Sequence, residues 1–121
     1  MWIFTTVGFF SVVQKPGEES LTIWARVASD LNRLRMAYLP KLSPTIVTKK
    51  GDYPYRATVS HDDFAKGLAR MARDIHYGNF KNEVEKEMGA QRERTYEEIW
   101  SLLRELEEEE GSDRSRGRSW S

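Results

Sequence analysis

Apolar and polar positions along the first quarter of the chain follow two different patterns. From Trp2 to Gln14, β-branched and aromatic residues fill both parities, which is typical of a strand covered on both faces. From Leu21 to Val27, apolar residues alternate strictly with Thr22, Trp24 and Arg26. We therefore predict a central first strand, in which Gly8 marks a bulge, and a half-buried second strand whose outer face is aromatic and basic.

A helix and two shorter strands are predicted next. Ser29 stands where it can cap a helix, whose apolar face is Leu31, Leu34 and Tyr38 and which Pro40 ends. Strands are predicted over Thr45–Lys49 and Tyr55–Val59, because both stretches are rich in β-branched and aromatic residues.

Helix-start signals dominate the second half. Ser60 and the Val59/Phe64 pair predict a helix that runs to about Gly78, and Asn79 predicts a second helical segment that Gly89 ends. Thr95 to Glu98 reads as a capping box that opens a third helix. The apolar face of this last helix is Ile99, Leu102, Leu103 and Leu106, which we interpret as part of the core, with Trp100 at its edge.

These elements predict a two-layer α+β fold. The order is ββαββα with additional C-terminal helices, around a four-stranded, mainly antiparallel sheet. With 121 residues, the chain is expected to form a single domain over 1–106. Residues 107–121 are an acidic run and a Ser/Arg/Gly tail, for which we predict disorder from about Gly111.

The composition excludes several kinds of functional site. The chain has no cysteine, which excludes disulfides, thiolate zinc sites and cysteine nucleophiles and favours a cytoplasmic protein. No apolar run approaches the roughly 20 residues of a membrane span, so no membrane contact is expected. Charge is uneven: residues 1–60 hold eight Lys/Arg and four Asp/Glu, whereas residues 61–110 hold eight and fourteen.

Several short motifs resemble those of one protein family. The opening Met1-Trp2-Ile3-Phe4, the segment Gly8-Phe9-Phe10-Ser11-Val12-Val13, and the later Asp52-Tyr53-Pro54-Tyr55-Arg56 and Asn79-Phe80-Lys81 are similar to a family of short uncharacterised bacterial proteins. The likeness spans most of residues 1–105. It implies a bacterial source and supplies no activity.

Catalytic signals are sparse. His61 lies beside two aspartates, and His76 follows near the end of the same predicted helix; both positions are also explained by the helix dipole. There is no phosphate-binding glycine motif, and we expect no cofactor and no metal. The enzymatic alternative is a metal-independent nuclease that uses Tyr53, Tyr55, Arg56 and His61.

A binding function has more support. Trp24, Arg26 and Arg56 share the outward parity of two strands. Our leading hypothesis is a non-enzymatic interaction module that presents this surface to a protein partner or to its own copy. The alternative is a platform for single-stranded nucleic acid, which zero net charge and an acidic C-terminal helix disfavour. The candidate surface comprises Trp24, Arg26, Lys49, Lys50, Tyr53, Tyr55, Arg56 and His61.

Overall fold

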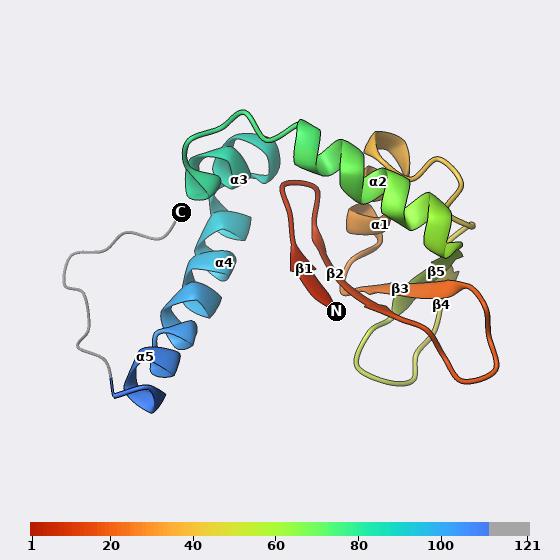
Figure 1. The fold of residues 1–121 in the computed structure, drawn as a ribbon, viewed down its shortest axis with the longest axis horizontal. Helices are drawn as coiled ribbons and strands as arrows, with labels where there is room; N and C mark the ends of the chain where they lie inside the picture. Colours follow the sequence, from red (N-terminus) through yellow and green to blue (C-terminus); the bar gives the residue numbers. More distant parts are fainter. Residues whose placement is uncertain (112–121) are drawn as a thin grey trace. The chain divides into compact units, whose positions relative to one another are not determined.

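An antiparallel sheet organises the first part of the protein. The computed structural model describes residues 1–111, and these contain a five-stranded sheet of order β1-β2-β3-β5-β4 (Figure 1). The strands are β1 (Trp2–Phe4), β2 (Phe9–Val13), β3 (Leu21–Ala25), β4 (Ile46–Val47) and β5 (Tyr55–Val59). Two helices accompany them, α1 (Ala28–Ala37) and α2 (His61–Arg73). The α+β class is therefore confirmed, with one strand more than predicted.

The extra strand comes from the first segment, which is a hairpin rather than one long strand. β1 pairs antiparallel with β2, with Phe4 opposite Phe9. The Thr5 hydroxyl oxygen accepts the Gly8 amide at 3.0 Å and so closes the turn. Gly8 has a φ of 153°, which only glycine adopts without strain, so it serves a chain reversal and not a bulge. The prediction of a central first strand is wrong for β1, which lies at the sheet edge, while β2 is flanked on both sides.

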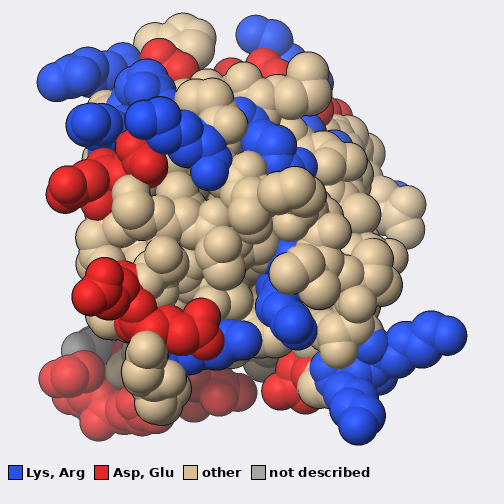
Figure 2. Space-filling view, turned by 90° about the vertical axis from the view of Figure 1, so that its right-hand side faces the viewer, with Lys and Arg blue, Asp and Glu red and all other residues tan. Residues whose placement is uncertain are grey.

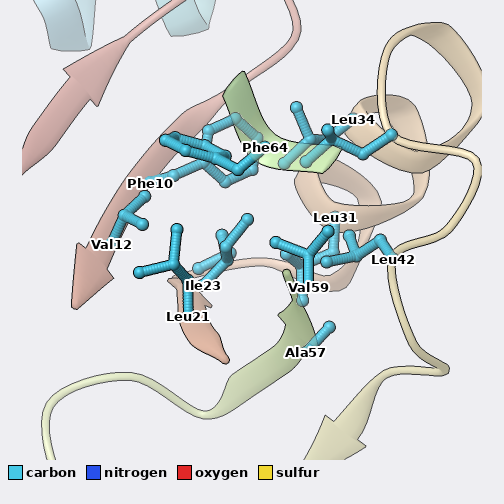
Figure 3. Packing of buried hydrophobic residues seen from close by; sticks show 12 residues of the cluster. Phe10, Val12, Leu21, Ile23, Leu31, Leu34, Leu42, Ala57, Val59 and Phe64 are labelled. Atoms are coloured by element: carbon cyan, nitrogen blue, oxygen red, sulfur yellow. The ribbon is translucent and has the colours of Figure 1, made fainter. Parts of the chain in front are cut away.

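Both helices of this part cover the same face of the sheet (Figure 1). The core beneath them is a cluster of buried apolar side chains from both layers (Figure 3). Phe10 and Ile23 from the sheet, Leu31 and Leu34 from α1, and Phe64 from α2 belong to it. Because alternate residues of a strand point to opposite faces, the burial of these residues defines the other side of the sheet as the outer face.

Helix starts follow the predicted caps at two of four places. The Ser60 hydroxyl accepts the Asp63 amide at 3.1 Å, and the Asn79 side chain accepts the Asn82 amide at 3.0 Å, which confirms both caps. The Ser29 cap is wrong, because Val27 is the N-cap of α1, two residues earlier, and Ser29 lies within the first turn.

A second compact unit begins at Tyr77, whereas the first comprises Met1–His76. The helices of the second unit are α3 (Phe80–Met88), α4 (Ala90–Leu103) and α5 (Glu105–Glu109). The boundary between the two units falls inside the range 1–106, over which a single domain was predicted. Part of the acidic run forms α5, and the tail prediction lies almost entirely outside the described residues.

Two features of α4 and α5 correct the sequence interpretation. The helix starts directly after Gly89, so Thr95 is an interior residue whose hydroxyl donates to the Gln91 carbonyl at 3.2 Å, and the capping box is wrong. The leucines predicted as core, Leu102, Leu103 and Leu106, are exposed.

Candidate binding surface

Strand register brings one row of side chains together across the outer face. Trp2 lies opposite Ser11, Ser11 opposite Trp24, Trp24 opposite Arg56, and Arg56 opposite Ile46. Directly opposed residues of antiparallel strands share a face, so this row crosses all five strands. The row combines two indole rings with a guanidinium group.

Three cations surround two of the rings. The Lys15 ammonium and the Arg56 guanidinium each lie 5.4 Å from the Trp24 ring centre, and the Trp24 and Tyr53 rings are 6.3 Å apart. Arg26 lies 4.7 Å from the Tyr53 ring and also donates to the Asp52 carbonyl at 2.8 Å. We call Lys15, Trp24, Arg26, Tyr53 and Arg56 the aromatic-cation cluster. Each cation–ring contact at an exposed site stabilises by about 0.5–1 kcal/mol, so the cluster orders long side chains at the surface.

A second aromatic group adjoins this cluster on the same face. Trp2 contacts Phe9 edge-on at 5.6 Å between ring centres, and Phe4 packs on Phe9 at 4.6 Å. Trp2 is 68% exposed. Sequence interpretation missed this group, because only the hairpin turn places Phe9 beside Phe4. The outer face therefore carries two groups of rings, one of them rich in cations, with Ser11 between Trp2 and Trp24 in the row.

Small polar residues lie between the large ones. Thr22 is on the outer face between Val13 and Thr58, yet it is only 1% exposed, and its hydroxyl oxygen has no hydrogen-bond partner among the described residues. Ser11 is buried in the same way. The larger neighbours thus shield these residues, and the outward surface is formed by rings, methyl groups and guanidinium groups.

The predicted surface residues divide into two sets. Trp24, Arg26, Tyr53 and Arg56 are brought together. Tyr55 is not, because it pairs with Ala25 on the helix-covered side and packs against the core. Including Tyr55 in the surface is wrong for a simple reason: neighbours in a strand point to opposite faces.

The lysine that joins the aromatic-cation cluster is not one of the two that were predicted. Lys49 and Lys50 lie exposed in the turn before β5, and no contact with a ring is found for them in the described part of the chain. Lys15, which was missed, does join the cluster. It has the parity of Ser11 and Val13, so extending the strand alternation by one step past β2 would have found it.

His61 stands apart from the cluster. It is the exposed first residue of α2, five positions beyond Arg56. Five residues of extended chain span roughly 16 Å. Together with the opposite orientation of Tyr55, this separation means that the four residues of the nuclease hypothesis do not converge on one point.

The second unit contains its own aromatic pair. Phe80 of α3 stacks on Tyr96 of α4 with ring centres 6.0 Å apart and planes 8° from parallel, and Arg92 lies 5.8 Å from the Tyr96 ring. Lys81 approaches the buried Glu93 carboxylate at 3.9 Å. These contacts join α3 to α4 and give the helical hairpin an internal structure.

The surroundings of Tyr77 change the proton affinity of its phenol. Burial raises the pKa of the Tyr77 phenol above its ordinary value, and the nearby negative charge of Glu83 raises it further. Both effects favour the neutral phenol. This is the reverse of what a nucleophilic tyrosinate would need.

Metal binding and membrane crossing have no support in the described residues. Within residues 1–111, no group of three or more His, Asp or Glu side chains could hold a metal ion. No helix in the same range is long and apolar enough to cross a bilayer.

Comparison with known proteins adds no relative. No family model, no curated protein and no solved structure matches this chain. The resemblance of its motifs to a bacterial family stays a prediction, and the functional argument rests on the outer face itself.

Proposed function

We propose that this protein is a non-enzymatic interaction module whose outer face binds a protein partner that presents carboxylates next to apolar side chains. The observation that carries the proposal is the aromatic-cation cluster on a sheet face that neither α1 nor α2 covers. Rings supply contact area with little loss of conformational freedom, and guanidinium groups pair with carboxylates in a fixed geometry. Such a surface suits recognition rather than bond-breaking chemistry.

The chemistry around Trp24 favours a protein over a nucleic acid. Two cations already lie over this ring. A base that stacks on the ring competes with them, whereas a carboxylate adds to their charge pairing and leaves the ring contacts in place. Exposed Val13 and Ile46 extend the surface with apolar area that a protein can bury.

A single-stranded nucleic acid is the second candidate, and one observation favours it. Exposed Trp2 and the cations of the cluster occur on one antiparallel sheet, and rings with nearby cations stack bases and neutralise phosphates. This candidate differs from the first in its dependence on salt, because phosphate binding releases counterions.

The test is binding of the labelled full chain to an array of acidic amphipathic peptides and to basic peptides with the same apolar residues. We expect selective binding to the acidic peptides. The affinity for them should fall about tenfold in Arg56→Gln, which corresponds to one lost charge contact. Lys66→Gln is the matched control, because Lys66 is an exposed cation on α2, away from the outer face.

Three results would contradict the proposal. The first is equal binding to acidic and basic peptides, and the second is equal losses in the two variants. The third is binding confined to a thymidine oligonucleotide, with an affinity that falls steeply as salt rises; that result would favour the nucleic-acid platform instead.

A further inference from the structure

The last helices of the second unit expose a stripe of apolar side chains. Ile99, Leu102, Leu103 and Leu106 are spaced at i, i+3, i+4 and i+7, so they lie along one side of α4 and the start of α5. The three leucines are 64%, 54% and 53% exposed. We call these four residues the leucine stripe.

A row of carboxylates borders the leucine stripe. Glu98, Glu105 and Glu109 follow one another at i, i+7 and i+11, which keeps them on one flank of the stripe. All three are exposed, and none forms an ion pair within residues 1–111. The helical surface is therefore apolar in its centre and anionic along its border.

This surface is the chemical complement of the outer face. The first unit, residues 1–76, holds eleven Lys/Arg and seven Asp/Glu, whereas residues 77–111 hold five and eleven. The outer face places Lys15, Arg26 and Arg56 beside exposed rings. Cations beside rings on one surface match carboxylates beside leucines on the other, which is the complementarity that selects partners. Figure 2 shows one face of the molecule, where uncharged residues fill much of the surface and Lys and Arg stand beside Asp and Glu along its left side.

The length of the helix that carries the leucine stripe also matches the width of the sheet. From Glu98 to Glu109 a helix rises roughly 16 Å, at 1.5 Å per residue. Five strands separated by about 4.8 Å give a sheet roughly 19 Å wide. A single helix can thus cross the sheet and place its carboxylates along the row that contains Trp24 and Arg56.

We propose that the leucine stripe of one copy docks on the outer face of a second copy. The inference rests on the proposed function and names the partner of that same surface. Because the stripe and the outer face are different surfaces, the contact is heterologous, and each copy can both offer a stripe and accept one.

The experiment uses two full-length variants that each lose one surface. Trp24→Ala/Arg56→Glu alters the outer face, and Leu102→Ser/Leu106→Ser alters the leucine stripe. We expect the wild-type mass in sedimentation equilibrium to rise with concentration, and each variant alone to associate at least about tenfold more weakly. An equimolar mixture should form a one-to-one pair, because each variant retains the surface that the other has lost.

Unchanged circular dichroism and an unchanged urea midpoint in each variant show that folding is intact. Lys66→Gln and Met36→Ser provide a matched charge loss and a matched apolar loss at exposed positions of α2 and α1, and both should associate like wild type.

Several outcomes would overturn the inference. A wild-type chain that stays monomeric at all concentrations would do so, as would variants that do not pair when mixed. Association lost in the stripe variant and kept in the face variant would show stripe-to-stripe contact instead. The peptide array separates the two proposals: a monomeric wild type that still selects acidic peptides leaves the proposed function standing and removes only the second copy as its partner.

Discussion

Asp30 shows how one buried side chain fixes the position of an entire hairpin. Its carboxylate is part of α1 and is 2% exposed, yet it accepts the Phe9 amide at 3.1 Å. Arg33 donates to the same carboxylate at 2.6 Å and to the Val7 carbonyl at 3.1 Å. A buried charge is tolerated where it is paired and hydrogen-bonded, as it is here. These bonds hold the turn to α1 and thereby set where the Phe9 ring lies on the outer face.

Gly8 permits this arrangement because it has no side chain. A Cβ at this position would lie 2.5 Å from the Asp30 Cγ, and the φ of 153° disfavours any other residue. We predict that Gly8→Ala lowers the free energy of unfolding by about 3 kcal/mol, from backbone strain and overpacking together. The measurement is urea unfolding followed by circular dichroism.

Gly17→Ala is the matched comparison for Gly8. Gly17 also has a positive φ, of 79°, but nothing lies within 4 Å of its Cβ position. Backbone strain alone predicts that Gly17→Ala lowers the free energy of unfolding by about 1 kcal/mol. Equal losses at the two glycines would show that the contact with Asp30 is unimportant.

Tyr77 predicts a dependence of stability on alkaline pH. Its pKa is raised by burial and then by Glu83, so the folded state holds the phenolic proton more tightly than the unfolded state. This contribution to stability is complete below the ordinary pKa of about 10 and is lost as the pH rises through the raised value. We expect wild-type stability to fall above about pH 10, and to fall less steeply in Tyr77→Phe.

The Tyr77 prediction has an independent readout. Ultraviolet titration of tyrosinate should show that Glu83→Gln lowers the pKa of Tyr77, which is identified by its loss in Tyr77→Phe, because the substitution removes the negative charge nearby. The same pH profile in wild type and Tyr77→Phe would contradict the assignment.

At the scale of single residues, the sequence was informative wherever strand parity could be applied. Parity correctly placed Trp24 and Arg56 on one face, and the register confirms that they lie opposite each other. It also predicts that Tyr55, next to Arg56, points the other way, and ignoring this produced the error at that position. The Asp30 contact could not be anticipated, since Asp30 and Phe9 are 21 residues apart.

At the scale of elements, strictly alternating segments were predicted well and continuous apolar segments were not. β3 and β5 fall within their predicted ranges, because one buried face gives a clear period of two. The run from Trp2 to Val13 has no such period, since β2 is buried on much of both faces and β1 adds rings of its own. Nothing local distinguishes one long strand from two strands joined at Gly8.

The predicted helix start was wrong where two helix-start signals lie close together in the sequence. Gly89 ends α3 and precedes α4 directly, and its φ of 96° allows the chain to turn between them. Ala90 to Arg94 are mostly good helix formers, so the helix begins there and continues through Thr95. A capping motif inside a run of helix formers is therefore weaker than the glycine that precedes it.

At the scale of the whole molecule, the α+β class follows from the sequence, and the openness of the outer face does not. Binary patterning identifies the apolar side of each strand, but it cannot say whether helices cover one face or both. For that reason the periodicity predicts the leucine stripe as core, although its three leucines are exposed. Two exposed surfaces of complementary chemistry are visible only in the folded chain.

The central claim is that the outer face is open and serves as a binding surface, and hydroxyl-radical footprinting of the full chain tests it most directly. In dilute solution, we predict strong labelling of Trp2, clear labelling of Trp24 and none of the fully buried Phe10, followed by protection of both tryptophans as the concentration rises. Trp2 and Trp24 that resist labelling in dilute solution, or that stay equally labelled at every concentration and with every acidic peptide, would contradict the account.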